Sequence, residues 1–176
     1  LQHRGQESTG ISVSDGEEVR THKAMGHVAD VYRKKTLQRL AGINAIGHTR
    51  YSTAGDSSPN NAQPIVVKGT HGKFSLCHNG NLINAVSLRQ DLESERAVFQ
   101  STSDTEVILH LLARATAEDL PGALAVALEK VQGAYSLLLL NEETLIGARD
   151  PYGFRPLCLG KVNGSYVLAS ESCAFD

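Results

Sequence analysis

The sequence predicts an α+β domain in which helices pack on antiparallel sheets, and two observations lead to that fold class. Segments with the alternation typical of strands occupy the first half of the chain and return after Gly133, whereas segments with helical spacing lie between them. The 176 residues contain no clear linker, repeat or shift in composition. We therefore expect one domain with its own hydrophobic core.

The strands expected before the helices are short apolar or alternating runs that end at turn residues. The first run is followed by Asp15-Gly16, a turn pair, so the next run is its antiparallel partner. A third run is mostly apolar and predicts a buried strand that delivers Arg50 at its end. Residues 55–64 predict a turn-rich loop, after which two runs form a hairpin. These expected strands cover residues 10–14, 18–23, 43–48, 65–68 and 73–78.

Four helices are expected from apolar residues at spacings of three and four. The first is amphipathic and ends near Gly42. A later one opens with Ser103 and Glu106, the pattern of a capping box, and another begins near Pro121, a residue suited to a first helical turn. The expected helices cover residues 28–40, 84–92, 103–115 and 121–131, and the later strands cover residues 135–140, 144–148, 157–160 and 166–170.

The composition excludes several classes of protein. A net charge of −2 and a pI of about 6.4, without any block of like charge, argue against binding to nucleic acid or to an anionic membrane. The short basic run Arg33-Lys34-Lys35 is interpreted as a solvated helix face. The longest apolar stretches are far too short to span a bilayer. Three cysteines without a CxxC pair suit a reducing cytoplasm, where we expect the protein.

Three short polar motifs lie at the edges of apolar runs, where a folded scaffold can hold them in place. The first is GHTRYST, residues 47–53, in which Arg50 follows a strand and has hydroxyl side chains after it. A guanidinium in such a place can bind a carboxylate through two parallel hydrogen bonds. The alternative is a structural ion pair within the protein.

The second motif is HNGN, residues 78–81, which is expected to close a strand and enter a helix. Asn79 offers a side-chain N–H, and Gly80 offers a backbone N–H that a ligand can approach closely. Two such donors aimed at one point make an oxyanion hole, whereas the alternative is an ordinary Asn-Gly turn. The third motif is SDTE, residues 103–106. It places Asp104 in the first turn of a helix, where the helix dipole keeps the carboxylate ionised and able to receive an ammonium group; the alternative is a first-turn acid without a ligand.

No residue of the sequence is a convincing nucleophile for such a site. Cys77 alternates with apolar residues and is expected in or near the core, while Cys158 lies in an apolar strand and Cys173 near the last residue. His71 and His78 flank Cys77 on a hairpin without further ligands, so no metal site is predicted.

With these motifs together, the chain resembles the glutaminase domain of the amidophosphoribosyltransferase family, within the class II glutamine amidotransferases and the N-terminal nucleophile hydrolases. The resemblance covers essentially all 176 residues, and seven motifs in order make it specific. The motifs are residues 1–8, 47–55, 78–82, 103–106, 133–136, 149–157 and 170–174.

The resemblance implies a sandwich of two antiparallel sheets between helix layers. Members of the family use the Cys at the mature N-terminus as nucleophile, with its own α-amino group as the base. In the family that Cys, a strand and a helix precede the position of Leu1. We therefore expect this sequence to be a piece of a longer protein, truncated at its N-terminus and unable by itself to hydrolyse glutamine.

The resemblance also assigns roles by position. Asn79 and Gly80 match the oxyanion hole, and Arg4 and Gly5 match the Arg-Gly step that lines the nucleophile. Four further residues match positions that bind the substrate. Arg50 would hold the α-carboxylate of glutamine with Thr53 beside it, Tyr51 matches an aromatic position next to that arginine, and Asp104 would bind the α-amino group.

The activity implied is the release of ammonia from glutamine to make 5-phosphoribosylamine from phosphoribosyl diphosphate, the first step of de novo purine biosynthesis. The phosphoribosyltransferase domain and its Mg²⁺ would lie outside residues 1–176, and no cofactor is expected within them. Some members carry a 4Fe–4S cluster with ligands outside this segment. The expected partners are glutamine and, through the second domain, phosphoribosyl diphosphate, and the full-length protein is expected to be a homo-oligomer.

Two alternatives stay open from the sequence. One is another class II enzyme. Glucosamine-6-phosphate synthase has a similar Gly-His-Thr-Arg stretch, but with Trp in place of Tyr51 and His in place of Ala54. Asparagine synthetase shares the element at residues 149–157 but lacks the Arg-Tyr-Ser-Thr pattern. The other alternative is a degenerate domain that binds glutamine or a partner without chemistry.

Overall fold

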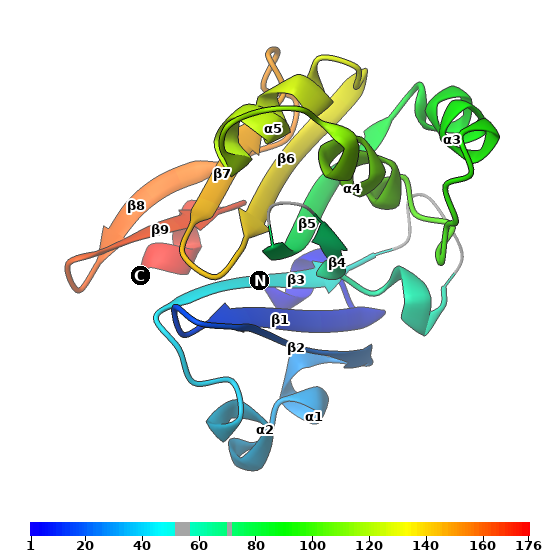
Figure 1. Ribbon diagram of the computed structural model, residues 1–176. Helices are drawn as coiled ribbons and strands as arrows, with labels where there is room; N and C mark the ends of the chain where they lie inside the picture. Colours follow the sequence, from blue (N-terminus) through cyan, green and yellow to red (C-terminus); the bar gives the residue numbers. More distant parts are fainter. Residues whose placement is uncertain (52–56, 70–71) are drawn as a thin grey trace.

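The computed structural model describes residues 1–51, 57–69 and 72–176, which form two antiparallel sheets stacked between helices (Figure 1). A three-stranded sheet and a four-stranded sheet are the inner layers, and a two-stranded hairpin extends to one side. The expected α+β sandwich is confirmed.

The three-stranded sheet presents Arg50 at one of its ends. The strands are β1 (Ser8–Ser14), β2 (Val19–Met25) and β3 (Asn44–Arg50), with β1 in the middle. Ser8 lies opposite Arg50 in the register of β1 with β3, so the start of β1 and the end of β3 meet at the same end of the sheet.

In the four-stranded sheet, β5 (Gly72–Leu82) is longer than its neighbour β4 (Ile65–Gly69). The strands of this sheet, in hydrogen-bonded order, are β4, β5, β6 (Gly133–Leu140) and β7 (Leu145–Arg149). The first residue of β4 pairs with Leu76, whereas β5 continues to Leu82. From Cys77 onward, β5 therefore has β6 along one edge, and none of the described strands pairs with the other edge.

The main hydrophobic core lies between this sheet and the helices α3 (Ala85–Ser94), α4 (Thr105–Arg114) and α5 (Leu120–Leu128). α4 packs across β4 and β5 and against α5. The apolar stripe expected for this helix is buried, as are the side chains of the sheet beneath it. These core residues include Val107, Ile108, Leu111, Leu112, Phe74, Leu76, Leu137 and Leu139.

The single helix expected over residues 28–40 is wrong, because the structure has two short helices, α1 (Val28–Val31) and α2 (Lys34–Gln38). Between them the backbone of Arg33 is extended. Tyr32 is buried there and donates a hydrogen bond from its hydroxyl to the carbonyl of His22 on β2, 2.6 Å away. This contact ties the chain to the sheet at the point where the helix breaks.

Two further expectations about the strands need correction. β3 forms, but it is an edge strand, so only Ile46 and Arg50 within it are buried, and Ile43 before it is 75% exposed. The HNGN motif does not close its strand either, because β5 runs through Asn79 to Leu82. The reason is that β6 pairs with β5 along the whole motif.

The capping box expected at Ser103 and Glu106 is also not formed in that way. The hydroxyl oxygen of Ser103 accepts a hydrogen bond from the N–H of Thr105. The carboxylate of Glu106 accepts instead from the backbone N–H groups of Gln100 and Ser101, each at 2.8 Å. Glu106 therefore fixes the loop before α4 and does not bond to the backbone N–H of Ser103, as it would in a capping box.

The remaining described segments are short. They are the hairpin of β8 (Cys158–Val162) and β9 (Ser165–Ala169) and the 3-10 turns Gln2–Arg4, Pro59–Asn61 and Ser172–Phe175. In the turn after β7, Asp150 accepts hydrogen bonds from the N–H groups of Tyr152 and Phe154, and Gly153 has a φ of +65°. Arg149 donates to the carbonyls of Gly153 and Arg155, so its side chain stabilises this turn.

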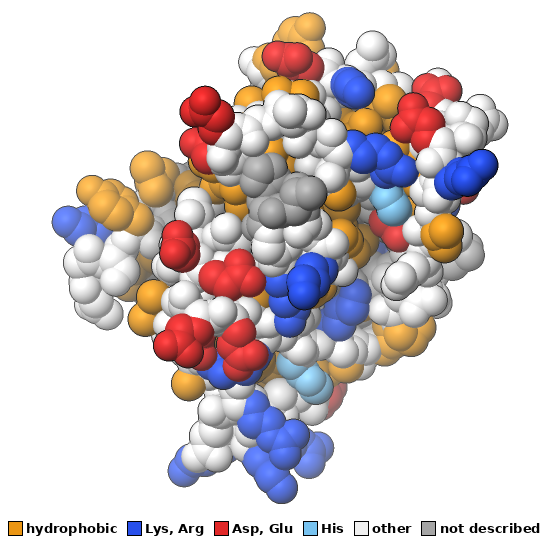
Figure 2. Space-filling model, viewed as in Figure 1, with side chains coloured by type: hydrophobic (Ala, Val, Ile, Leu, Met, Phe, Trp, Pro, Cys, Tyr) orange, Lys and Arg blue, Asp and Glu red, His pale blue; other side chains and the backbone are white. Residues whose placement is uncertain are grey.

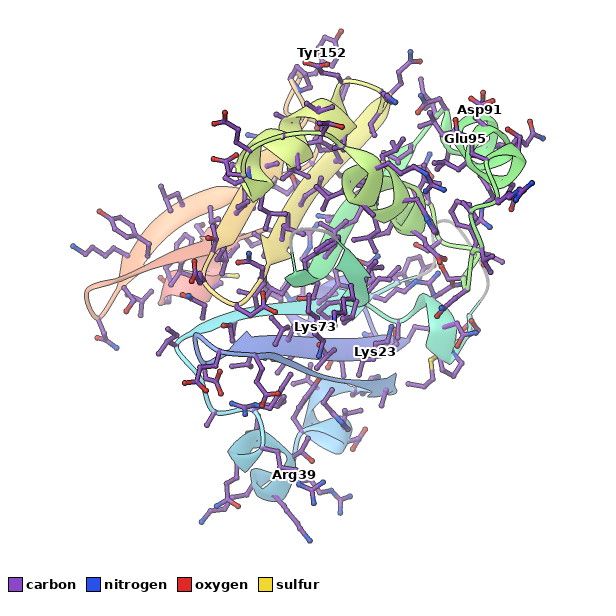
Figure 3. All side chains as sticks on the ribbon, viewed as in Figure 1. Lys23, Arg39, Lys73, Asp91, Glu95 and Tyr152 are labelled. Atoms are coloured by element: carbon purple, nitrogen blue, oxygen red, sulfur yellow. The ribbon has the colours of Figure 1, made fainter. Side chains whose placement is uncertain are left out.

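One lysine side chain connects the two inner sheets, and another connects the three-stranded sheet to the loop before β4. Lys23 of β2 donates to the carbonyl of Ala62, 2.6 Å away, and Lys73 of β5 donates to the carbonyl of Val19. Both are labelled in Figure 3, where they lie near the boundary between the sheets. Because each lysine also buries part of its aliphatic stem, these contacts help to fix one sheet on the other.

The basic run expected on a solvated face is exposed, since Arg33, Lys34 and Lys35 all lie on the surface. Figure 2 shows Lys and Arg side chains gathered at this lower end of the molecule, over α2. Of the helices in the described ranges, none has the length and apolar character needed to cross a membrane.

We expect Leu137→Ala to lower the free energy of unfolding by about 2–5 kcal/mol, because Leu137 is fully buried under the helices and its loss leaves a cavity. Leu159→Ala removes the same atoms from a side chain that is 67% exposed and should change stability by no more than about 0.5 kcal/mol. Urea unfolding of the two variants measures both values, and equal losses would show that the core is placed wrongly.

Candidate active site

A cavity of about 540 Å³ lies where the two sheets and the start of α4 meet, and it brings the three polar motifs together. That volume is in the range of small-ligand sites. Arg50 comes to it from β3, Asn79 and Gly80 from β5, and Asp104 from the residue before α4. The cation, the donors and the anion expected from the sequence therefore line one cavity.

Arg50 is held at the end of β3 and is 4% exposed. Its Nη1 donates to Oε1 of Glu7 at 2.8 Å, and the carbonyl of Arg50 accepts from the N–H of Glu7 at 3.1 Å. The structural ion pair that was the alternative for this arginine is thus present. It does not exclude a binding role, because a guanidinium carries five N–H donors and Arg50 also lines the cavity.

The open edge of β5 presents backbone donors to the cavity. Successive residues of a strand point their N–H groups to opposite edges, so the N–H groups of His78, Gly80 and Leu82 share the edge away from β6. His78 donates to Oε1 of Gln63 at 2.6 Å, and Leu82 donates to Oδ2 of Asp104 at 3.0 Å. The N–H of Gly80 lies between these two and faces the cavity side.

Asn79 and Gly80 have the properties that an oxyanion hole requires. The Asn79 Nδ2 is buried, and no acceptor among the described residues bonds to it. A Cβ on Gly80 would lie 2.0 Å from the carbonyl oxygen of Ala134, so only glycine fits at this point of the strand. A buried donor without a partner among the described residues is costly, and a ligand oxygen at this point would remove that cost.

Asp104 is ionised at neutral pH. Burial acts to raise its pKa, but the hydrogen bond and charge of His78 and the N–H groups of Leu82 and Thr105 lower the pKa below the ordinary 3.8. Its Oδ1 lies 3.5 Å from Nδ1 of His78. The sequence predicted an ionised Asp104 from the helix dipole, and the structure adds a histidine and a strand amide as causes.

Arg4 and Gly5 lie on the side of the cavity that is formed by the end of β3. Arg4 lines the cavity and donates from Nη1 to Oε1 of Glu171 at 2.6 Å. This bond, followed by that of His3, lowers the pKa of Glu171 to about 2. A Cβ on Gly5 would come within 2.6 Å of the backbone of Thr49 and Arg50, so the glycine allows the N-terminal segment to lie against β3.

Of the other residues considered from the sequence, Tyr51 lies at the cavity, two are outside the described residues, and the cysteines lie away from it. Tyr51 lines the cavity but is 72% exposed, so it lies at the rim. Thr53 lies outside the described residues, and so does His71. None of the three cysteines lines the cavity, and burial raises the pKa of the Cys77 thiol, which leaves it unreactive.

Sequence reasoning missed several residues of the site. His48 lines the cavity, and burial followed by the charge of His78 lowers its pKa to about 4, which keeps it neutral. Gln63 and Arg155 also line it, and they come from the loop before β4 and the turn after β7. His48 and His78 stand inside the polar motifs, so motif membership was a usable signal for them. Arg155 belongs to the motif at residues 149–157, but no site role was expected for it, and Gln63 carried no such signal.

Comparison with known proteins assigns the family. The family model of the glutamine amidotransferase domain matches residues 48–176. Amidophosphoribosyltransferase from Bacillus subtilis is 44% identical over 177 residues, which cover 100% of this chain and 37% of the relative. The Archaeoglobus fulgidus enzyme is 47% identical, with 100% and 39% covered. The chain spans less than two fifths of the length of these relatives.

Solved structures agree with this result. The glutamine phosphoribosylpyrophosphate amidotransferase of B. subtilis, complexed with ADP and GMP, superposes with a TM-score of 0.93 at 43% identity over 99% of this chain and 38% of that chain. A predicted glutamine amidotransferase from Pseudomonas aeruginosa shares the fold, with a TM-score of 0.51 at 15% identity over 82% of this chain and 60% of that chain. This chain belongs to the glutamine amidotransferase domain family, and it is similar over its whole length to the glutaminase domain of amidophosphoribosyltransferases.

Proposed function

We propose that this chain is the ammonia-producing domain of an amidophosphoribosyltransferase. It would hydrolyse the side-chain amide of glutamine, and a transferase domain outside these residues would use the ammonia to convert phosphoribosyl diphosphate to 5-phosphoribosylamine. That reaction opens de novo purine synthesis, and we place it in the cytoplasm. The identity to amidophosphoribosyltransferases over the whole chain supports the choice of acceptor.

The observation that carries the glutaminase assignment is the set of charges and donors on one cavity wall. Arg50 would take the α-carboxylate of glutamine and Asp104 its α-ammonium group. The amide carbonyl oxygen would then lie at the N–H of Gly80 and the Nδ2 of Asn79. The hydrogen bonds from both donors become stronger as that oxygen gains negative charge in the tetrahedral intermediate. The donors therefore stabilise the transition state more than the bound substrate.

The nucleophile that we propose is the thiol of a Cys at the N-terminus of the mature full-length polypeptide, as the family resemblance implies. Leu1 lines the cavity, which supports an approach from that side. The α-amino group of the Cys, with an ordinary pKa of about 8, would take the thiol proton. Among the described residues no three His, Cys, Asp or Glu side chains gather as a metal site would require, so we assign Mg²⁺ or an iron–sulfur cluster to other parts of the polypeptide.

The acceptor is tested with the full-length protein. Glutamine is supplied with phosphoribosyl diphosphate, with fructose 6-phosphate, or with aspartate and ATP, all in the presence of Mg²⁺, and glutamate formation is measured. We expect acceleration by phosphoribosyl diphosphate. Acceleration by either of the others would assign the chain to a glucosamine-6-phosphate synthase or an asparagine synthetase, and glutamine binding without any glutamate would indicate a binding domain.

Asn79→Ala should lower kcat for glutamine hydrolysis by about 10²–10³, because it removes one of the two donors for the oxyanion. KM should change little, since this donor acts mainly in the transition state. Steady-state kinetics of the full-length variant measure both constants. Asn81→Ala is the matched control, because Asn81 lies in the same motif but is exposed and does not line the cavity, and it should retain kcat. An unchanged kcat in Asn79→Ala would contradict the oxyanion-hole assignment.

Arg50→Lys should raise KM for glutamine by about tenfold or more, because a lysine keeps the charge but cannot form two parallel hydrogen bonds to a carboxylate. Arg114→Lys, on the exposed face of α4, is the control and should leave KM unchanged. Thermal unfolding of both variants separates a binding effect from loss of the Glu7 ion pair. A normal KM in a folded Arg50→Lys protein would show that the carboxylate binds elsewhere.

Glutamine affinity should stay constant from neutral pH down to about pH 5. The folded-state pKa of Asp104 lies below its ordinary value of 3.8, so the carboxylate keeps its charge over this range. Because glutamine binds the folded protein, the charge that receives its ammonium group is lost only as the pH falls through this lowered pKa. Calorimetric titration with L-glutamine at several pH values measures this, and a loss of affinity centred near pH 6 would point to a histidine instead.

A further inference from the structure

His78 lies between the two groups proposed to bind opposite ends of glutamine, and the proposed function gives it no role. Its side chain is 1% exposed. On one side of the ring, Nδ1 lies 3.5 Å from Oδ1 of Asp104 and 3.2 Å from Oγ1 of Thr105. On the other side, Nε2 lies so close to Gly80 that a Cβ there would be 2.6 Å away. One buried ring therefore contacts both the carboxylate and the glycine.

Hydrogen bonds among His78, Gln63 and Thr105 form a small network that holds the ring in place. The backbone N–H of His78 donates to Oε1 of Gln63, and Nε2 of Gln63 donates to Oγ1 of Thr105 at 3.2 Å, which in turn meets Nδ1 of His78. The three residues come from β5, the preceding loop and α4, and all are buried. Buried polar networks of this kind restrict side chains to one arrangement.

The carboxylate of Asp104 is fixed at both oxygens by β5. Its Oδ2 accepts from the N–H of Leu82, and its Oδ1 faces the His78 ring. Loss of the ring would remove the contact at Oδ1, and the carboxylate could then turn about its remaining bond to the N–H of Leu82. The distance from this carboxylate to the N–H of Gly80 would then no longer be fixed, although the strand between them would be unchanged.

We propose that His78 is a positioning residue that sets the span between the Asp104 carboxylate and the Gly80 N–H, and so makes the site select glutamine over asparagine. The inference rests on the proposed function, in which Asp104 receives the α-ammonium group and Gly80 the amide oxygen. Asparagine is one methylene shorter. In a site of fixed span it cannot reach both groups at once, whereas a loosened carboxylate can follow it.

The test compares two substitutions of similar size in the full-length protein. Asn at position 78 can place an amide where Nδ1 stood, whereas Gln reaches toward the place of Nε2 and leaves the Asp104 side empty. We expect His78→Gln to lower the ratio of kcat/KM for glutamine to kcat/KM for asparagine by about tenfold, chiefly through the KM for glutamine. His78→Asn should keep the ratio within about twofold of the unmodified protein.

A substrate analogue separates positioning from general damage. Glutaramate is glutamine without the α-amino group, so its inhibition constant should be the same in His78→Gln and in the unmodified protein. His110→Gln, on α4 outside the cavity, is the control histidine, and unfolding midpoints are measured for every variant. If His78→Gln does not fold, Thr105→Val removes the hydroxyl that meets Nδ1 and should lower the same ratio.

The outcomes distinguish this inference from the proposed function. Asp104→Asn should raise the KM for glutamine, and an unchanged KM would overturn the proposed binding mode itself. A raised KM in Asp104→Asn, together with an unchanged glutamine-to-asparagine ratio in His78→Gln, would overturn only the role of His78. If His78→Gln weakened the binding of glutamine and of glutaramate by the same factor, His78 would have only a structural role.

Discussion

The site depends on the difference in length between β5 and β4. Beyond the end of β4, no strand within residues 1–51, 57–69 and 72–176 pairs with this edge of β5, and buried N–H groups must find other partners. The side chains of Gln63 and Asp104 supply two of them. In the proposed function the donor of Gly80 between them takes the amide oxygen of the substrate, so the strand edge would determine both where that oxygen lies and which side chains surround it.

Hydrophobic packing supplies the rigidity that this arrangement needs. α4 buries its apolar stripe on β4 and β5, and each such side chain contributes about 1.5–3 kcal/mol. Asp104 stands at the start of that helix, so the same packing that stabilises the domain places the carboxylate beside the strand edge. The burial of Arg50 and Asp104 costs stability, and the core together with the Glu7 and His78 partners offsets that cost.

The sequence predicted the strands and three of the four helices, because these follow from local periodicity. The convergence of Arg50, Asn79, Gly80 and Asp104 was expected from the family resemblance that their motifs carry. The sequence did not predict the break at Tyr32, which depends on a hydrogen bond to the neighbouring strand. It also placed the end of β5 before Asn79, since Asn-Gly favours turns, whereas pairing with β6 overrides that preference. Gln63 was missed because its role comes from tertiary contact alone.

A crystal structure of the full-length protein with L-glutamate, the product of hydrolysis, tests the central claim most directly. The account predicts that the α-carboxylate lies against the Arg50 guanidinium, the ammonium group against the Asp104 carboxylate, and one side-chain oxygen within hydrogen-bond distance of the Gly80 N–H. A product bound in this cavity with its ammonium group away from Asp104, or with its side chain away from β5, would contradict it.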